Sequence, residues 1–119
     1  MYDQNNVFAK ILRGELPAEK VYEDANVLAF KDIHPSAPIH VLVIPKKLCC
    51  SFGEFIAQAS VPEVSSFWKG VYETVKMLGV AENGYRLVVN TGLDSGQEVP
   101  HLHVHILAGK SLGPKICNI

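Results

Sequence analysis

The sequence has no long apolar run and no excess of either charge. Eleven lysines and arginines stand against twelve aspartates and glutamates, so the net charge is −1 at pH 7. This balance argues against the basic surface that duplex nucleic acid requires and against a polybasic membrane anchor. The longest apolar stretches, such as 41–44, are far shorter than the ~20 residues that span a bilayer as a helix. We therefore expect no nucleic acid and no membrane among the partners, and any anionic ligand must be small.

Cysteine is scarce as well. The chain has three cysteines, of which Cys49 and Cys50 are adjacent, and this odd number and spacing indicate neither a disulfide framework nor a metal knuckle. The N-terminus shows no cationic segment followed by an apolar stretch, so we expect no secretory signal. Both absences predict a reduced, cytoplasmic compartment. The chain of 119 residues is enough for one domain, 1–119, that folds without covalent staples.

Histidine is concentrated in one place. The stretch HLHVHIL at 101–107 carries three of the five histidines on alternate positions. In a β-strand, alternate side chains point to the same face, whereas a helix would spread these three around its axis. The aliphatic residues between them favour a strand. We expect the three imidazoles on one face and Leu102, Val104 and Ile106 on the opposite face, toward a core.

A row of imidazoles can serve three purposes. It can bind zinc, it can handle protons or attack phosphorus as a nucleophile, or it can be the polar side of an ordinary surface strand. The preceding loop, 91–97, contains Gly92, Ser95 and Gly96, and glycine lets backbone N–H groups approach an anion closely. We find no cysteine or carboxylate at a spacing that suits a metal ligand. The neighbours therefore favour a phosphate site without a metal or other cofactor.

The remaining pattern predicts an α+β domain with a mostly antiparallel sheet of five strands and two to three helices. Asn5 or Asn6 can cap a first short helix that ends at Gly14. The run from Ile39 to Ile44, interrupted only by His40, is typical of a central strand. We expect strands at 20–23, 27–32, 39–44, 85–90 and 101–107, and helices at 7–12, at 51–58 and from Pro62 to Gly79.

Four sequence blocks together resemble the histidine triad nucleotide-binding proteins of the Hint branch. The resemblance runs from about Val7 to Pro114, and the ending LGP at 112–114 is similar to bacterial members. It implies the fold of that family, with the five-stranded sheet extended across a homodimer. The blocks, in chain order, are DIHP at 32–35, HVLVIPKK at 40–47, GQEV at 96–99 and HLHVHIL at 101–107.

The resemblance also implies an activity, the hydrolysis of purine nucleoside phosphoramidates to AMP or GMP through a nucleotidyl-histidine intermediate. His103 would be the nucleophile at the α-phosphorus, and His105 would contact the phosphate oxygens and the leaving group. His101 and His40 would orient and polarise these two. The residues expected to bind the nucleotide are Asp32 for the ribose hydroxyls, Phe8, Ile11, Phe30, Ile33 and Leu42 for the base, and Asn90, Gly96, Gln97 and Val99 at the phosphate end.

Without the resemblance, several of these residues have simpler interpretations. Asp32 could merely form an Asx-turn, His40 could be a core histidine, and the apolar residues could be core. Glu98 stands where eukaryotic relatives have a phosphate-binding serine, so we exclude it from the catalytic set. Two other functions stay open: a dinucleoside polyphosphate hydrolase or nucleotidyl transferase with the same triad, and a non-catalytic nucleotide-binding or zinc-binding module.

Overall fold

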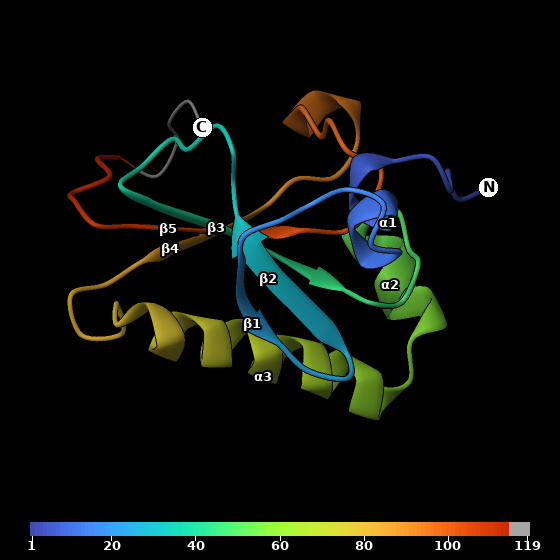
Figure 1. Ribbon diagram of the computed structural model, residues 1–119, viewed down its shortest axis with the longest axis horizontal. Coiled ribbons are helices and arrows are strands. Elements are labelled where there is room, and N and C mark those ends of the chain that lie inside the picture. Colours follow the sequence, from blue (N-terminus) through green and yellow to red (C-terminus); the bar gives the residue numbers. More distant parts are fainter. Residues whose placement is uncertain (115–119) are drawn as a thin grey trace.

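The computed structural model describes residues 1–114, so the third cysteine, Cys117, lies outside the described part (Figure 1). Three helices and five strands follow one another, with a short 3-10 turn before the last strand. In chain order they are α1 (Val7–Leu12), β1 (Lys20–Glu23), β2 (Val27–Lys31), β3 (Ile39–Pro45), α2 (Phe52–Gln58), α3 (Val61–Leu78), β4 (Arg86–Val89), η1 (Leu93–Ser95) and β5 (Val104–Ala108).

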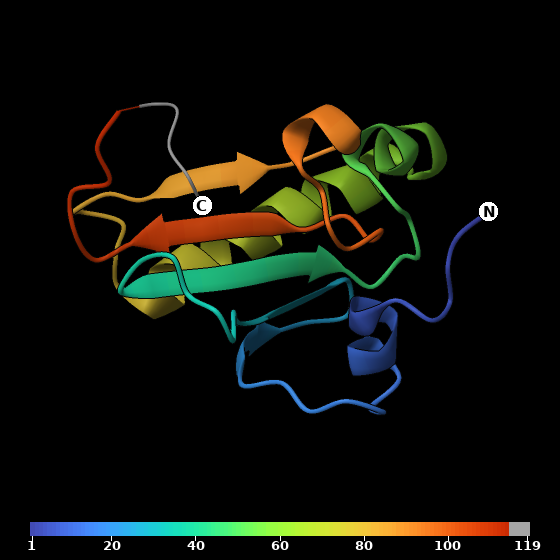
Figure 2. The same cartoon turned by 90° about the horizontal axis from the view of Figure 1, so that it is seen from above.

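The five strands form one antiparallel sheet in the order β1-β2-β3-β5-β4. The predicted α+β class is confirmed, and β3 is the central strand, as its apolar run predicted. The long helix α3 covers one face of the sheet, while α1 lies beside β2 on the opposite face (Figures 1 and 2). No helix within residues 1–114 is both long and apolar enough to cross a membrane.

Strands β2 and β3 are buried on both faces. Val27 and Val43 pack toward α3 in one cluster of apolar side chains. Their neighbours Leu28 and Leu42 point the other way, into a second cluster with Phe8 of α1. Alternation along the strand divides these side chains between the two faces, so the same backbone supports the structural core and the face that carries the histidines.

The helix ends follow from short-range signals. Helix α3 begins at a capping box, in which the Ser60 hydroxyl accepts from the N–H of Glu63 and the Glu63 carboxylate accepts from the N–H of Ser60. Helix α3 therefore starts at Val61, one residue before Pro62, the start that we predicted. Helix α2 has the predicted Ser51 cap, but the Glu54 carboxylate accepts from the N–H of Cys50 rather than from Ser51.

The histidine stretch is only partly a strand, and this corrects the prediction for 101–107. Strand β5 begins at Val104 because the chain before it is bent: the N–H of His101 bonds to Val99 O, and the N–H of Leu102 bonds to Cys49 O. The predicted alternation survives the bend. Leu102, Val104 and Ile106 are all buried in the cluster under α3, so the histidines occupy the opposite side of the chain.

Helix α3 packs tightly against strand β2 at Gly70, and this contact generates a prediction. A Cβ added there would lie 2.5 Å from Cγ2 of the fully buried Val27. Gly70→Ala should therefore lower the free energy of unfolding by about 1–3 kcal/mol, measured by urea denaturation. Gly53→Ala in α2 is the matched control, since nothing lies within 4 Å of its added Cβ, and it should be neutral or stabilising. Equal effects of the two changes would contradict the steric explanation.

Candidate active site

The five-stranded sheet carries four histidines on the face away from α3. His40 comes from β3 and His105 from β5, where His105 pairs with Leu42. The His40 and His105 rings lie 5.1 Å apart, as do those of His103 and His105. The His103 ring also meets the edge of Phe8 of α1, with 5.0 Å between centroids. The prediction that the alternating histidines line one face next to His40 is therefore confirmed.

Backbone carbonyls fix the tautomers of two histidines. His103 Nδ1 lies 2.7 Å from the carbonyl oxygen of His101, and His101 Nε2 lies 2.9 Å from the carbonyl oxygen of Pro45. A carbonyl oxygen only accepts, so each of these ring nitrogens must carry the proton. In the neutral His103 ring, the lone pair is consequently on Nε2. An unprotonated Nε2 is the form of imidazole that can act as a nucleophile.

A backbone N–H fixes the other two histidines in the opposite sense. The N–H of Ser36 donates to His40 Nδ1 at 2.9 Å, so the neutral His40 ring carries its proton on Nε2. This atom lies 2.9 Å from His105 Nδ1 and donates to it. His105 therefore keeps its own proton on Nε2, where it is available as a hydrogen-bond donor. The Nε2 atoms of the adjacent rings His103 and His105 are thus complementary: His103 Nε2 has a lone pair, and His105 Nε2 carries a proton.

Burial keeps these histidines uncharged. Burial is the main reason that the pKa of His101 and of His105 is lowered to about 4, and the nearby His103 acts in the same direction on both, while the bond to Pro45 O opposes the effect in His101. Burial also lowers the pKa of His103, an effect opposed by its hydrogen bond to His101 O and by the carboxylates of Asp32 and Glu98. The pKa of His40 is lowered by burial against the attraction of Asp32. At neutral pH the nucleophilic lone pair of His103 is therefore not blocked by a proton.

A carboxylate does lie next to the histidines, which corrects our expectation from the spacing. Asp32 Oδ2 is 3.4 Å from His40 Nε2, and Asp32, His40 and His105 offer ligand atoms within 4.8 Å of one another. The tautomers nevertheless do not suit a metal ion, because His40 Nε2 carries a proton and Ser36 already occupies the lone pair on Nδ1. A metal would have to break that bond or deprotonate the ring. The cluster therefore favours a chain of hydrogen bonds, and a metal-free site stays a prediction.

The expected base-binding residues are brought together with one exception. Phe8, Phe30 and Leu42 are buried in one apolar cluster. Ile11 is partly buried and packs against it, and so does Val99, which we expected at the phosphate end. Ile33 lies apart from this cluster: its side chain is 85% exposed in the turn after β2.

The expected phosphate-end residues build the loop before the histidines. Gln97 accepts from the N–H of Gly92 and donates to the carbonyls of Cys50 and Val99, and Asn90 donates to Ser95 O. Both side chains are thus used to hold the loop in shape. Gly96 ends η1 with φ 78°, a conformation that a side chain would strain. Asp32 likewise forms the Asx-turn considered above, since its Oδ1 accepts from the N–H of His34.

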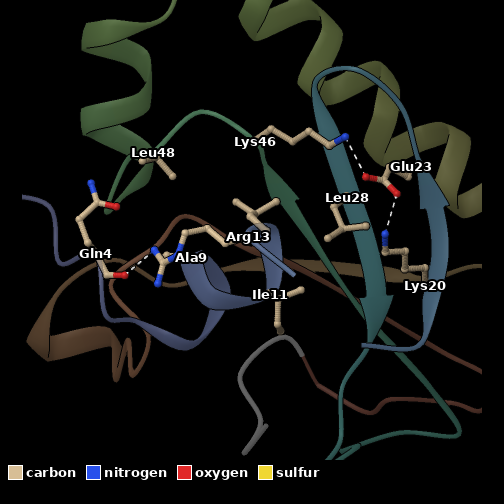
Figure 3. A pocket seen from close by; sticks show the side chains of 10 residues that line it. Gln4, Ala9, Ile11, Arg13, Lys20, Glu23, Leu28, Lys46 and Leu48 are labelled. Carbon is tan, nitrogen blue, oxygen red and sulfur yellow. Dashed lines mark hydrogen bonds and ion pairs between the residues drawn. The ribbon is translucent and has the colours of Figure 1, made fainter. Parts of the chain in front are cut away.

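A separate cavity of about 260 Å³ opens beside α1 (Figure 3). Of the expected base-binding residues, it contains only Ile11. Its cationic rim is already paired: Lys20 and Lys46 both contact Glu23, as the dashed lines in Figure 3 show, and Arg13 pairs with Glu15. Little free positive charge is therefore left there for a phosphate.

Three positioning contacts were not predicted. The hydroxyl of Tyr2 lies 2.5 Å from His101 Nδ1, and the N–H of Ser36 and the carbonyl of Pro45 bind histidine rings through the backbone. The sequence could not predict the two backbone contacts, because every residue has a carbonyl and nearly every residue has an N–H. It could not predict the contact of Tyr2 with His101, because the two residues are far apart in the chain. The position of Asp32 beside His40 could have been inferred, because both residues stand where the antiparallel strands β2 and β3 end and begin.

A five-stranded antiparallel sheet that aligns neutral histidines beside an apolar cluster defines a histidine triad protein. The family model of the HIT domain matches residues 13–112, and the chain belongs to that family. It is 51% identical over 115 residues to an uncharacterised HIT-like protein of Azospirillum brasilense, covering 97% of this chain and 94% of that one.

Two further relatives are informative. The purine nucleoside phosphoramidase of Escherichia coli is 38% identical over 115 residues, covering 97% of this chain and 96% of that one. A histidine triad protein from Clostridium difficile is 43% identical and superposes with a TM-score of 0.84, covering 98% of this chain and 100% of that one.

The buried neutral histidines predict that acid destabilises the fold. A histidine whose pKa is about 4 when folded and ~6.5 when unfolded takes up its proton preferentially in the unfolded chain. Stability should therefore be full above about pH 7 and fall as the pH drops from about 6.5 toward 4, with His101 alone accounting for about 2 kcal/mol between pH 7 and pH 5. Urea denaturation across this range measures the loss. An unchanged free energy of unfolding from pH 7 to pH 5 would contradict it.

Proposed function

We propose that the protein is a hydrolase of the HIT family that cleaves the phosphorus–nitrogen bond of purine nucleoside phosphoramidates. The observation that carries the proposal is the pair of neighbouring rings His103, with a lone pair on Nε2, and His105, with a proton on Nε2. Their centroids lie 5.1 Å apart, and His103 contacts Phe8 of the apolar cluster. Two solved structures support hydrolysis, because both are described as HIT family hydrolases. The one from Legionella pneumophila is 38% identical with a TM-score of 0.81, and the one from Clostridium thermocellum is 42% identical with a TM-score of 0.83. The phosphoramidase of E. coli supports the substrate class.

The reaction follows from the two tautomers. His103 Nε2 attacks the α-phosphorus, the P–N bond breaks, and the leaving amine takes up one proton from solvent. The Nε2–H of His105 donates to the phosphoryl oxygens as their charge grows. Water then attacks the phosphorus of the nucleotidyl-His103 intermediate, the P–Nε2 bond breaks, and the nucleoside 5′-monophosphate leaves with release of a proton. The net change consumes one water and regenerates neutral His103.

The other parts of the site have supporting roles in this proposal. Phe8, Phe30 and Leu42 would enclose the purine, and Asp32 would accept hydrogen bonds from the ribose hydroxyls. The loop that Gln97 holds in place would direct backbone N–H groups to the phosphate. Cys49 and Cys50 are both free, which supports the further proposal that the enzyme works in a reducing, cytoplasmic compartment.

The nucleophile is tested by His103→Ala. We expect loss of adenosine 5′-phosphoramidate hydrolysis by at least a thousandfold, while AMP still binds in a calorimetric titration because the apolar cluster is intact. His34→Ala is the matched control, since the His34 side chain is exposed in the turn after Asp32, and it should keep wild-type turnover. Substantial residual turnover in His103→Ala would refute the nucleophile. Faster turnover of diadenosine polyphosphates than of phosphoramidates by the wild type would favour the alternative hydrolase.

We also propose that the protein is a homodimer joined at β4. No strand within residues 1–114 pairs with the outer edge of β4, and large apolar side chains are exposed there and on α3. They are Leu87, Tyr72 and Met77. An unpaired edge flanked by apolar surface is suited to pairing with a second copy across a two-fold axis.

Sedimentation equilibrium tests the dimer. The wild-type protein should have twice the mass of one chain, and Leu87→Glu should shift it toward the monomer by burying a charge in the interface. Leu16→Glu is the matched control, because Leu16 is 39% exposed and Leu87 is 41% exposed, but Leu16 lies in the segment before β1, the strand at the opposite edge of the sheet from β4. A monomeric wild type, or equal effects of the two changes, would contradict the proposal.

A further inference from the structure

The N-terminal segment reaches the histidine row through Tyr2. The Tyr2 hydroxyl lies 2.5 Å from His101 Nδ1, although the two residues are 99 positions apart. The two rings also meet edge to face, with 5.7 Å between centroids. Asn6, the N-cap of α1, donates from Nδ2 to the Tyr2 hydroxyl at 2.8 Å. The start of the chain is thus tied to the site by side chains rather than by a strand.

The direction of each of these hydrogen bonds is determined. His101 Nε2 carries the ring proton because it donates to Pro45 O, so Nδ1 has a lone pair and can only accept. The Tyr2 hydroxyl therefore donates to His101. The lone pair on the hydroxyl oxygen accepts from Asn6 Nδ2, which has no acceptor capacity of its own. No other arrangement of protons satisfies all three residues.

His101 passes this constraint on to the nucleophile. Its carbonyl oxygen accepts from His103 Nδ1 at 2.7 Å, and this bond is what leaves the lone pair on His103 Nε2. The side chain of His101 is completely buried, so its Nδ1 has the Tyr2 hydroxyl as its hydrogen-bond partner and no contact with solvent in this structure. A change at the Tyr2 hydroxyl is therefore transmitted through the His101 residue to the bond that fixes the His103 ring.

We propose that Tyr2 is a positioning residue, whose hydroxyl holds His101 so that the His101 carbonyl keeps His103 in the tautomer with a free Nε2. The catalytic consequence rests on the proposed phosphoramidase activity, whereas the effect on the tautomer does not. Tyr2 itself does not touch the substrate in this proposal. Asn6 supports Tyr2 in this role, because it caps α1 and donates the hydrogen bond that orients the Tyr2 hydroxyl.

The kinetic test is Tyr2→Phe, which removes only the hydroxyl. We expect kcat for adenosine 5′-phosphoramidate to fall about tenfold, the change that the loss of one hydrogen bond represents, while KM stays within about twofold because the base and ribose contacts are untouched. Tyr22→Phe is the matched control. This change also removes a hydroxyl that donates a hydrogen bond, here to Asp24 Oδ2 at 2.8 Å. Because Tyr22 lies on β1, away from His101, the change should leave kcat unchanged.

The spectroscopic test is independent of turnover. Ring ¹⁵N chemical shifts report which nitrogen of each histidine carries the proton. In the wild type, His103 should be protonated on Nδ1 and His101 on Nε2. In Tyr2→Phe, the His101 Nδ1 resonance should move toward the value of an unbonded lone pair, and a second tautomer of His103 should become populated. If the wild type did not cleave the phosphoramidate, the proposed function would fail and these shifts would still decide the role of Tyr2.

Asn6→Asp provides a second variant that keeps the helix cap. Aspartate retains the oxygen that accepts from the N–H of Ala9 but replaces the Nδ2 donor by an acceptor, which draws the Tyr2 proton away from His101. Asn6→Asp also loses the bond from Nδ2 to Asp3 O. Its kcat should fall at least as much as that of Tyr2→Phe, and the double variant should be no worse than Asn6→Asp alone, because both changes remove the bond from Tyr2 to His101. Wild-type kcat and unchanged ring shifts in folded Tyr2→Phe, or additive losses in the double variant, would overturn the proposal.

Discussion

The structure of the site depends on one constraint: three of its four histidines, His40, His101 and His103, have a ring nitrogen bound to a backbone group that can only donate or only accept. The carbonyls of His101 and Pro45 can only accept, and the N–H of Ser36 can only donate. An exchanged tautomer would leave a buried donor or acceptor without a partner, at a cost of about 1–3 kcal/mol for each. Backbone groups thus set the tautomers of three rings, and His40 sets that of His105. These hydrogen bonds leave a lone pair on His103 Nε2 and a proton on His105 Nε2.

This arrangement requires that the backbone be held firmly, and the two-sided packing of the sheet provides that. The strands β2 and β3 present alternate side chains to α3 and to α1. The carbonyl of Pro45 is the last of β3, and Ser36 lies in the turn that leads into the same strand. The apolar packing under α3 thereby fixes the positions of the groups that set the histidine tautomers on the other face.

Most of the fold was predictable because its signals are local. The run around Val41 marked the central strand, and Ser51 and Gly79 marked helix ends through hydrogen bonds within a few residues. The start of β5 was not predictable, because the bend before Val104 depends on the contact of Leu102 with Cys49, far away in the sequence. For the same reason, the histidine spacing predicted the common face of His101, His103 and His105, and the resemblance added His40, but neither predicted the tautomers.

Of the residues expected to bind the nucleotide, those that lie together are the ones that burial brings together. Phe8, Phe30 and Leu42 are apolar residues on predicted elements, and packing alone brings them together. Ile33 follows β2 in a turn, where alternation no longer determines the direction of a side chain, and it is exposed. Gln97 was placed correctly near the loop, but the sequence could not show that all its polar atoms are used by the backbone.

Because β2 and β3 are packed on both faces, the histidine row cannot shift without disturbing the core beneath α3. A ligand entering such a site meets groups that are already in place, so the protein loses little conformational entropy when it binds. Selection by a rigid template acts only on the part of the ligand that enters it. Whatever part of the ligand extends beyond the apolar cluster into solvent is left unselected. Under the proposed function, one such site would accept many compounds that share the same nucleotide and differ in the leaving amine.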